Sequence, residues 1–245
     1  MLFRSARELD YRGVFRAHLA FDWAVQAIRS RRVDVRPLIT AQLALNAVAL
    51  GMAYALIALG FVLALNASGA VNFAHGDLVV LGGATAVSFG LWTELPAPLL
   101  LPFVALVLGV AGVIASRVAI LPLVQRPPEA TFVATIALAA VIEQALTVTM
   151  GAAARTSPSL IGGGRIEIAG IAVGRQPFAI VIVGVTLTAG LWYLLERTQT
   201  GRRMRAVAAD RHMARAVGIP VSRYVTLSLA LAGALAGIEI GRAHV

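Results

Sequence analysis

The densest group of polar side chains within the apolar part of the chain is the run Asn72, Phe73, Ala74, His75, Gly76 and Asp77. His75 and Asp77 form an ionisable pair, which is costly inside a membrane and by default marks a transport pathway or a coupling site. The alternative is an interfacial turn in which Asp77 caps a helix beginning at Leu78, since an Asp carboxylate accepts the unpaired N–H groups of a first turn. Both interpretations can hold together.

A metal or acid–base centre at this run is disfavoured. The remaining His residues, His18, His212 and His244, fall in segments that we expect outside the bilayer. The chain has no Cys, which excludes disulfides, thiolate nucleophiles and Cys-ligated zinc or iron–sulfur sites. The sequence therefore predicts no cofactor, no metal site and no catalytic residue.

A second polar feature, Glu143 with Gln144, interrupts an apolar run of about the length of a membrane span. A Glu at the middle of a span that faced lipid would cost roughly 2.5–3.5 kcal/mol. Glu143 is therefore predicted to face other helices or water. A structural hydrogen bond is the favoured role, and contact with a transported solute is the alternative.

A third group lies in the basic segment Gly201 to Val217 (GRRMRAVAADRHMARAV). The pattern predicts a short helix that ends at Gly218, before Pro220, with Arg on one side. Its apolar side consists of Met204, Val207, Ala208, Ala214 and Val217. Such a helix suits docking into a groove of a soluble partner, while the alternative is a solvated loop that only fixes topology.

Apolar runs must position these groups. The 245 residues are 59% hydrophobic and 13% charged, and the mean hydropathy is +0.83. These values are typical of a membrane protein and leave little chain for a soluble catalytic domain. We predict an all-α integral membrane protein, a multi-span helical bundle of about six membrane segments with 66–77 as a re-entrant or broken-helix element. The segments are 38–65, 78–92, 99–120, 131–150, 177–195 and 225–238.

The 21 basic residues, all Arg, concentrate in residues 1–37 and 196–224. This distribution favours membrane orientation over nucleic-acid binding and predicts that 196–224 is cytoplasmic. Counting spans backwards then puts the Arg-rich N-terminus outside, against the positive-inside rule, unless re-entry at 66–77 removes one crossing. Residues 1–37 are interpreted as a basic extension, either an amphipathic helix on anionic lipid or a product of a mis-assigned start codon.

Three stretches together resemble one family, the permease subunits of bacterial ABC importers for branched-chain amino acids. The sequence is similar to the first of the two paired permeases at Tyr54 to Gly76 (YALIALGFVLALNASGAVNFAHG), which an acid follows, Asp77. The loop and helix from Arg126 to Ile136 and the segment from Arg197 to Leu227 also resemble the family. The resemblance covers residues from about 40 to 237.

The resemblance implies a transport subunit of the bacterial inner membrane that hydrolyses nothing itself. Its implied partners are a second permease, ATP-binding cassette subunits, a periplasmic or lipid-anchored binding protein and membrane lipid, with no nucleic acid. The polar run and Glu143 with Gln144 would line the translocation pathway or form the re-entrant element. Gly201 to Gly218 would be the ATPase-coupling loop, with Arg202, Arg203, Arg205 and Asp210 as polar contacts and Met204 and Val207 filling the ATPase groove.

Two departures from the family pattern affect the expected boundaries. Residues 1–37 have no recognised counterpart, and 239–245 (EIGRAHV) are expected to be a non-native tail. Residues 38–238 would then be an incomplete permease domain. The competing hypothesis is an ion-coupled secondary transporter that uses His75, Asp77 and Glu143. The sequence leaves the substrate open among branched-chain and other amino acids, urea and short amides.

Overall fold

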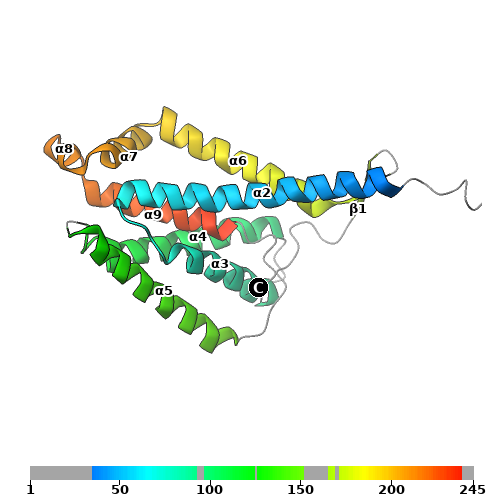
Figure 1. Cartoon of the computed structure of the whole chain (residues 1–245), viewed down its shortest axis with the longest axis horizontal. Helices are drawn as coiled ribbons and strands as arrows, with labels where there is room; N and C mark the ends of the chain where they lie inside the picture. Colours follow the sequence, from blue (N-terminus) through cyan, green and yellow to red (C-terminus); the bar gives the residue numbers. More distant parts are fainter. Residues whose placement is uncertain (1–34, 93–96, 125, 152–164, 169–170, 239–245) are drawn as a thin grey trace, which may run out of the picture. The chain divides into compact units, whose positions relative to one another are not determined.

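The computed structural model describes residues 35–92, 97–124, 126–151, 165–168 and 171–238. The chain divides into two units, Met1–Ala44 and Leu45–Val245, and the second unit carries almost all of the described structure. The elements, shown in Figure 1, are α2 (Val35–Ser68), α3 (His75–Trp92), α4 (Ala97–Ala115), η1 (Ser116–Ile120), α5 (Pro128–Met150), β1 (Arg165–Ile168), β2 (Ile171–Gly174), α6 (Arg175–Arg197), α7 (Gln199–Ala209), α8 (Arg211–Ala216) and α9 (Val221–Ile238).

Long apolar helices dominate this architecture. Within the described residues, four are long and apolar enough to cross a membrane, and they cover Gln42–Ser68, Leu99–Ile120, Pro128–Met150 and Arg175–Arg197. The shorter apolar helix Val221–Gly237 and helix α3 correspond to the other two predicted segments. The prediction of an all-α integral membrane protein is confirmed.

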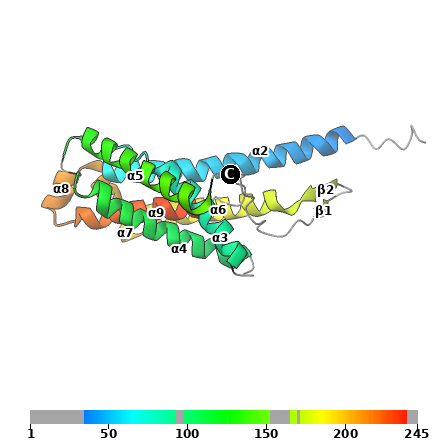
Figure 2. The same cartoon turned by 90° about the horizontal axis from the view of Figure 1, so that it is seen from below.

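The core of the bundle is the contact between α4 and α9, which lie side by side in both Figure 1 and Figure 2. A β-carbon added to Gly112 would overlap the backbone carbonyl of Leu229, and one added to Gly233 would overlap that of Leu108. Leu108 and Leu229 are fully buried. Glycines therefore let the two backbones approach closely, which is how helices associate in lipid without a hydrophobic driving force.

Several boundaries differ from the sequence prediction, and three of the differences change an interpretation. Helix α2 begins at Val35, inside the predicted extension 1–37, while residues 1–34 and the predicted tail 239–245 lie outside the described residues. The predicted polar loop 151–176 contains an antiparallel hairpin in which Arg165 pairs with Gly174. The predicted single helix over 201–217 is two helices, because Asp210 ends α7 and caps α8.

The segment between α2 and α3 bears on the predicted broken-helix element. Helix α2 ends at the side of the bundle where α7 and α8 lie, and α3 runs away from that side (Figure 1). The segment between them dips into the bundle, in agreement with the predicted re-entrant or broken-helix element. Its effect on the number of crossings, and the side of the membrane on which the Arg-rich N-terminus lies, stay predictions.

Candidate functional site

The connector Gly69–Ala74 between α2 and α3 is the predicted polar element. Gly69 ends α2 with a φ of 65°, a left-handed conformation that glycine adopts without a steric cost. The hydroxyl oxygen of Ser68 lies 2.8 Å from the carbonyl oxygen of Ala64 and 2.9 Å from that of Ala70. Ser68 thus ties the start of the connector to the last turn of the helix.

Helix α5 holds the middle of the connector. The backbone N–H of Phe73 donates to the Thr135 hydroxyl at 3.2 Å, and that hydroxyl lies 3.0 Å from the carbonyl oxygen of Phe132. Thr135 is fully buried. The Phe73 and Phe132 rings meet edge to face with centroids 4.5 Å apart. A hydroxyl and an aromatic pair therefore fix a stretch of non-helical backbone.

His75 shows how deep the connector reaches. Its Nε2 lies 3.3 Å from the carbonyl oxygen of Ile57, which stands eleven residues before the end of α2. At 1.5 Å per residue this places the imidazole about 16 Å below that end, roughly half the thickness of a hydrocarbon core. Gly60 admits the ring between α2 and α9, since a β-carbon there would lie 3.1 Å from His75 Cε1 and 3.2 Å from the Ala232 carbonyl oxygen. The structure thus agrees with a broken-helix element at membrane depth.

Two polar atoms at this depth have no hydrogen-bond partner within the described part of the chain, namely Asn72 Oδ1 and His75 Nδ1. Both residues are only 3% exposed. A carbonyl only accepts, so the His75 nitrogen beside Ile57 carries the proton and a neutral ring leaves Nδ1 as an acceptor. The connector therefore presents two buried acceptors, a feature that natural interiors rarely leave without a role.

Three further residues of the run, Phe73, Gly76 and Asp77, lie nearer to the surface of the chain. Helix α3 begins at His75, three residues before the predicted start, so Asp77 lies within the first turn instead of capping it. Its negative charge there is favoured by the positive end of the helix dipole. Gly76 is exposed, and a β-carbon there would meet nothing within 4 Å. Phe73 is exposed on one side.

Glu143 and Gln144 are both exposed on α5. The predicted structural hydrogen bond to the Glu143 carboxylate is not found among the described residues, where its backbone carbonyl accepts from Thr147 at 2.9 Å. The Glu143 and Asp77 carboxylates lie within electrostatic range of each other. Across the described ranges no group of three or more metal-ligating side chains gathers anywhere. The acidic pair therefore flanks the connector.

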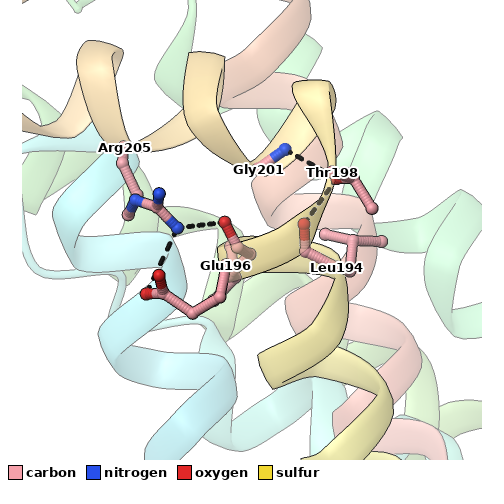
Figure 3. Close-up of polar contacts among 6 residues, drawn as sticks. Leu194, Glu196, Thr198, Gly201 and Arg205 are labelled. Carbon is pink, nitrogen blue, oxygen red and sulfur yellow. Dashed lines mark hydrogen bonds and ion pairs between the residues drawn. The ribbon is translucent and has the colours of Figure 1, made fainter.

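Helix α7 is fastened to the end of α6, as Figure 3 shows. Thr198 caps α7 by accepting from the Gly201 N–H at 3.0 Å, and its own hydroxyl donates to the Leu194 carbonyl. Arg205 Nη1 lies 3.2 Å from Glu196 Oε1 and also contacts the Leu195 carbonyl. These contacts bend the chain tightly between the span and the loop.

The orientation of α7 corrects the predicted docking face. Met204 and Val207 are buried in the chain's own core, where Val207 packs with Ile120 and Val225, so neither can fill a groove of a partner. Ala214 is also buried, while Ala208 and Val217 are exposed. The apolar side chains that face outward are Met213 and Val217, which are 64% and 72% exposed. The inward face of α7 packs on the bundle because α6 and α9 supply apolar surface next to it.

Asp210 and Gly218 set the geometry of α8. The Asp210 carboxylate accepts from the N–H groups of His212 at 2.7 Å and Met213 at 3.0 Å. The Met213 and His212 N–H groups hold the pKa of the Asp210 carboxyl below its usual range. Gly218 ends the segment with a φ of 81°, as the sequence predicted for a helix stop. Asp210, which was predicted to be a polar contact to a partner, thus has a structural role as the cap of α8.

Comparison with known proteins shows which sequences this chain resembles. A family model described as "Branched-chain amino acid transport system / permease component" matches residues 43–239. The permease protein BraD of Pseudomonas aeruginosa is 26% identical over 206 residues, which cover 79% of this chain and 67% of that protein. LivH of Escherichia coli K12 is 28% identical over 209 residues, with the same shares. No solved structure matches.

A third relative, from Methanocaldococcus jannaschii, is a probable branched-chain amino acid transport permease protein LivH. It is 27% identical over 199 residues, which cover 76% of this chain and 60% of that protein. The family model spans most of the chain, including the connector, α5 and the α7–α8 segment. This is a multi-pass, non-enzymatic transport subunit of the inner membrane, the transmembrane permease subunit of an ABC importer. The chain belongs to the family of permease components of branched-chain amino acid transport systems.

Proposed function

We propose that this permease carries branched-chain or related amino acids across the membrane and is driven by separate ATPase subunits. A second permease would complete the path, and a periplasmic or lipid-anchored binding protein would deliver the substrate. The names of the relatives support the substrate class. The single observation that carries the mechanism is the position of α7 and α8, which lie between α6 and α9 at the end of the bundle that the connector meets.

The proposed path follows the connector and α5. Asn72, His75 and Asp77 supply polar groups near the middle of the membrane, and Phe73 and Gly76 expose that stretch on one side. Glu143 and Gln144 stand on the neighbouring helix and face away from the chain's own core. A charged side chain there is tolerated where it meets water or another subunit. We therefore place the path along the outward face of α5 and α3.

The proposed ATPase contact is the outward face of α8. Met213 and Val217 form an apolar knob on a segment predicted to lie in the cytoplasm. Beside it an open hollow is lined by Leu121, Val124, Arg215, Ile219, Pro220, Val221 and Ser222. Arg202 and Arg203 keep the rest of the loop positive, although Arg203 also donates to the Tyr224 hydroxyl at 3.1 Å. An ATPase groove with an apolar floor and an acidic rim fits this surface.

The test is co-purification of the tagged permease with co-expressed ATPase subunits of a branched-chain amino acid importer. Met213→Glu with Val217→Glu places two charges on the proposed knob and is expected to abolish association. Ala208→Glu, on the exposed side of α7, is the matched control and is expected to retain the ATPase. Association that survives the double substitution would refute the α8 contact.

Reconstitution tests the transport class. Proteoliposomes that contain both permeases, the ATPases and the binding protein are expected to take up leucine, isoleucine or valine only when ATP is present on the side of the membrane that carries the ATPases. Uptake that persists without any ATPase would support the ion-coupled alternative at His75, Asp77 and Glu143 and overturn the importer mechanism. A panel of other amino acids, urea and short amides then defines the substrate.

A further inference from the structure

Arg211, the first residue of α8, reaches the end of α2. Its guanidinium lies against Gly69 so closely that any β-carbon at that position would overlap it. Gly69 is the point where α2 ends and the connector begins. Burial against this corner lowers the pKa of the Arg211 guanidinium from its usual value. The cytoplasmic loop and the membrane-embedded connector therefore touch at one pair of residues 142 positions apart.

The Arg211 side of this contact is held firmly. Asp210 orients the first turn of α8 through two backbone N–H groups. Ala214 is buried, and its carbonyl accepts from the Ile219 N–H at 2.9 Å, which joins α8 to the start of α9. A displacement of α8 must therefore carry Arg211 with it. The outward face of the same short helix carries Met213 and Val217, the proposed ATPase knob.

The Gly69 side leads straight to the buried polar groups. Six residues, 69–74, link α2 to α3, and the His75 imidazole that follows them reaches the depth of Ile57. The Ser68 side chain holds the start of this connector, and the His75 N–H donates to the Asn72 carbonyl at 3.2 Å at its far end. Because the segment is short and is held at both ends, a shift at Gly69 is passed on to Asn72 and His75.

We propose that Arg211 is a positioning residue that couples the ATPase-facing helix α8 to the membrane-embedded connector through Gly69. This inference rests on the proposed function. When the ATPases change conformation, α8 moves, Arg211 moves against Gly69, and the connector shifts the two buried acceptors between two arrangements. The loop thus controls the polar element directly, in addition to any movement of whole helices.

The competing explanation is that Arg211 only stabilises the carboxyl end of α2, where a cation is favoured by the helix dipole. The two explanations differ in what nucleotide does to the connector. If Arg211 only stabilises the end of α2, the response of the connector to ATP stays intact without it once the complex is assembled. A coupling role makes that response depend on Arg211.

The experiment uses the full complex in nanodiscs, with a spin label at Gly76→Cys. The chain has no native Cys, and a β-carbon at Gly76 meets nothing within 4 Å. In the labelled parent chain, ATP is expected to change the label mobility. With Arg211→Gln added, ATP hydrolysis continues and the mobility change is lost, and in proteoliposomes that contain the same complex uptake falls about tenfold, within the usual range of coupling between sites. Arg211→Lys restores part of both, and Arg223→Gln, an exposed Arg at the same end, alters neither.

A mobility change that is the same in Arg211→Gln as in the parent chain would overturn the inference. If the Arg211→Gln chain fails to assemble, a chain that retains Arg211 decides the question. It carries two spin labels, at His212→Cys and Gly76→Cys. The distance between them is expected to stay constant on ATP binding while each moves relative to a label at Val148→Cys on α5. A change in the 212–76 distance would refute the coupling. If the unsubstituted chain binds no ATPase at all, the proposed function fails first.

Discussion

At the scale of single residues, the hydroxyl of Thr135 fixes the backbone of the connector. It supplies the acceptor for the Phe73 N–H in a stretch of backbone that no helix or strand satisfies. Thr135→Val keeps the shape and leaves that buried N–H unpaired, which is expected to cost about 1–3 kcal/mol of stability and to weaken transport. Thr135→Ser keeps the hydroxyl and is the control. Thermal unfolding and uptake of both variants check this prediction, and equal losses in the two would point to packing instead.

Asp210 gives the loop a pH dependence. Because its pKa is lower in the folded loop than in the unfolded chain, its cap contributes fully above about pH 4, the unfolded value, and is lost as pH falls through the lower folded value. Hydrogen exchange of the His212 and Met213 amides is therefore expected to lose protection in that acid range. Asp210→Asn accepts hydrogen bonds without titrating, so its protection should stay flat. An identical acid profile in Asp210→Asn would assign the change to another group.

At the scale of elements, the close approach of α4 and α9 predicts a strong difference between two glycines one turn apart. Gly112→Ala must push α4 away from the Leu229 carbonyl and is expected to lower stability by about 1–3 kcal/mol. At Gly109 the added β-carbon would lie 3.5 Å from the Ala230 carbonyl oxygen, an ordinary contact. Gly109→Ala is therefore expected to be neutral or stabilising by up to about 1 kcal/mol. Thermal unfolding in one detergent compares the two, and similar melting temperatures would contradict the packing.

Element boundaries show what the sequence could predict. The apolar runs give the spans because lipid demands length and hydropathy and little else. The polar connector was predictable for the same reason, since its residues do not suit lipid. The inward turn of Met204 and Val207 was not, because an amphipathic helix buries its apolar side on whichever surface lies nearest. The break at Asp210 had a local signal, the preference of Asp for helix N-caps, although Asp210 was predicted to be a partner contact.

The contact between Arg211 and Gly69 had no sequence signal at all. It joins residues far apart in the chain and depends on the depth to which the connector folds back. In the sequence, Gly69 was only part of the predicted polar element 66–77, and Arg211 was only part of the basic segment 196–224. Only tertiary packing brings a long cation onto a residue without a side chain.

At the scale of the whole molecule, the outer surface of the helices is apolar, as lipid requires, with large exposed side chains such as Val141 and Val148 on α5. Glu129 lies in the first turn of α5, but Glu143 lies well inside the helix, where it is charged and exposed beside the exposed Gln144. Lipid contact there would cost roughly 2.5–3.5 kcal/mol. In the assembled importer this side of α5 is therefore expected to face water or another subunit, while Val141, about 200° away around the helix at 100° per residue, faces lipid.

Single cysteines in this Cys-free chain test that division. Glu143→Cys in the assembled complex is expected to react with a charged, membrane-impermeant thiol reagent, because the proposed path admits water to that face. Val141→Cys is the matched control, also exposed in the isolated chain, and is expected to stay unmodified because lipid excludes the charged reagent. If the reaction at 143 also changes with ATP, the face opens and closes with the transport cycle. Equal reactivity at both positions, or none at 143, would remove Glu143 from the path and leave the connector as its only polar part.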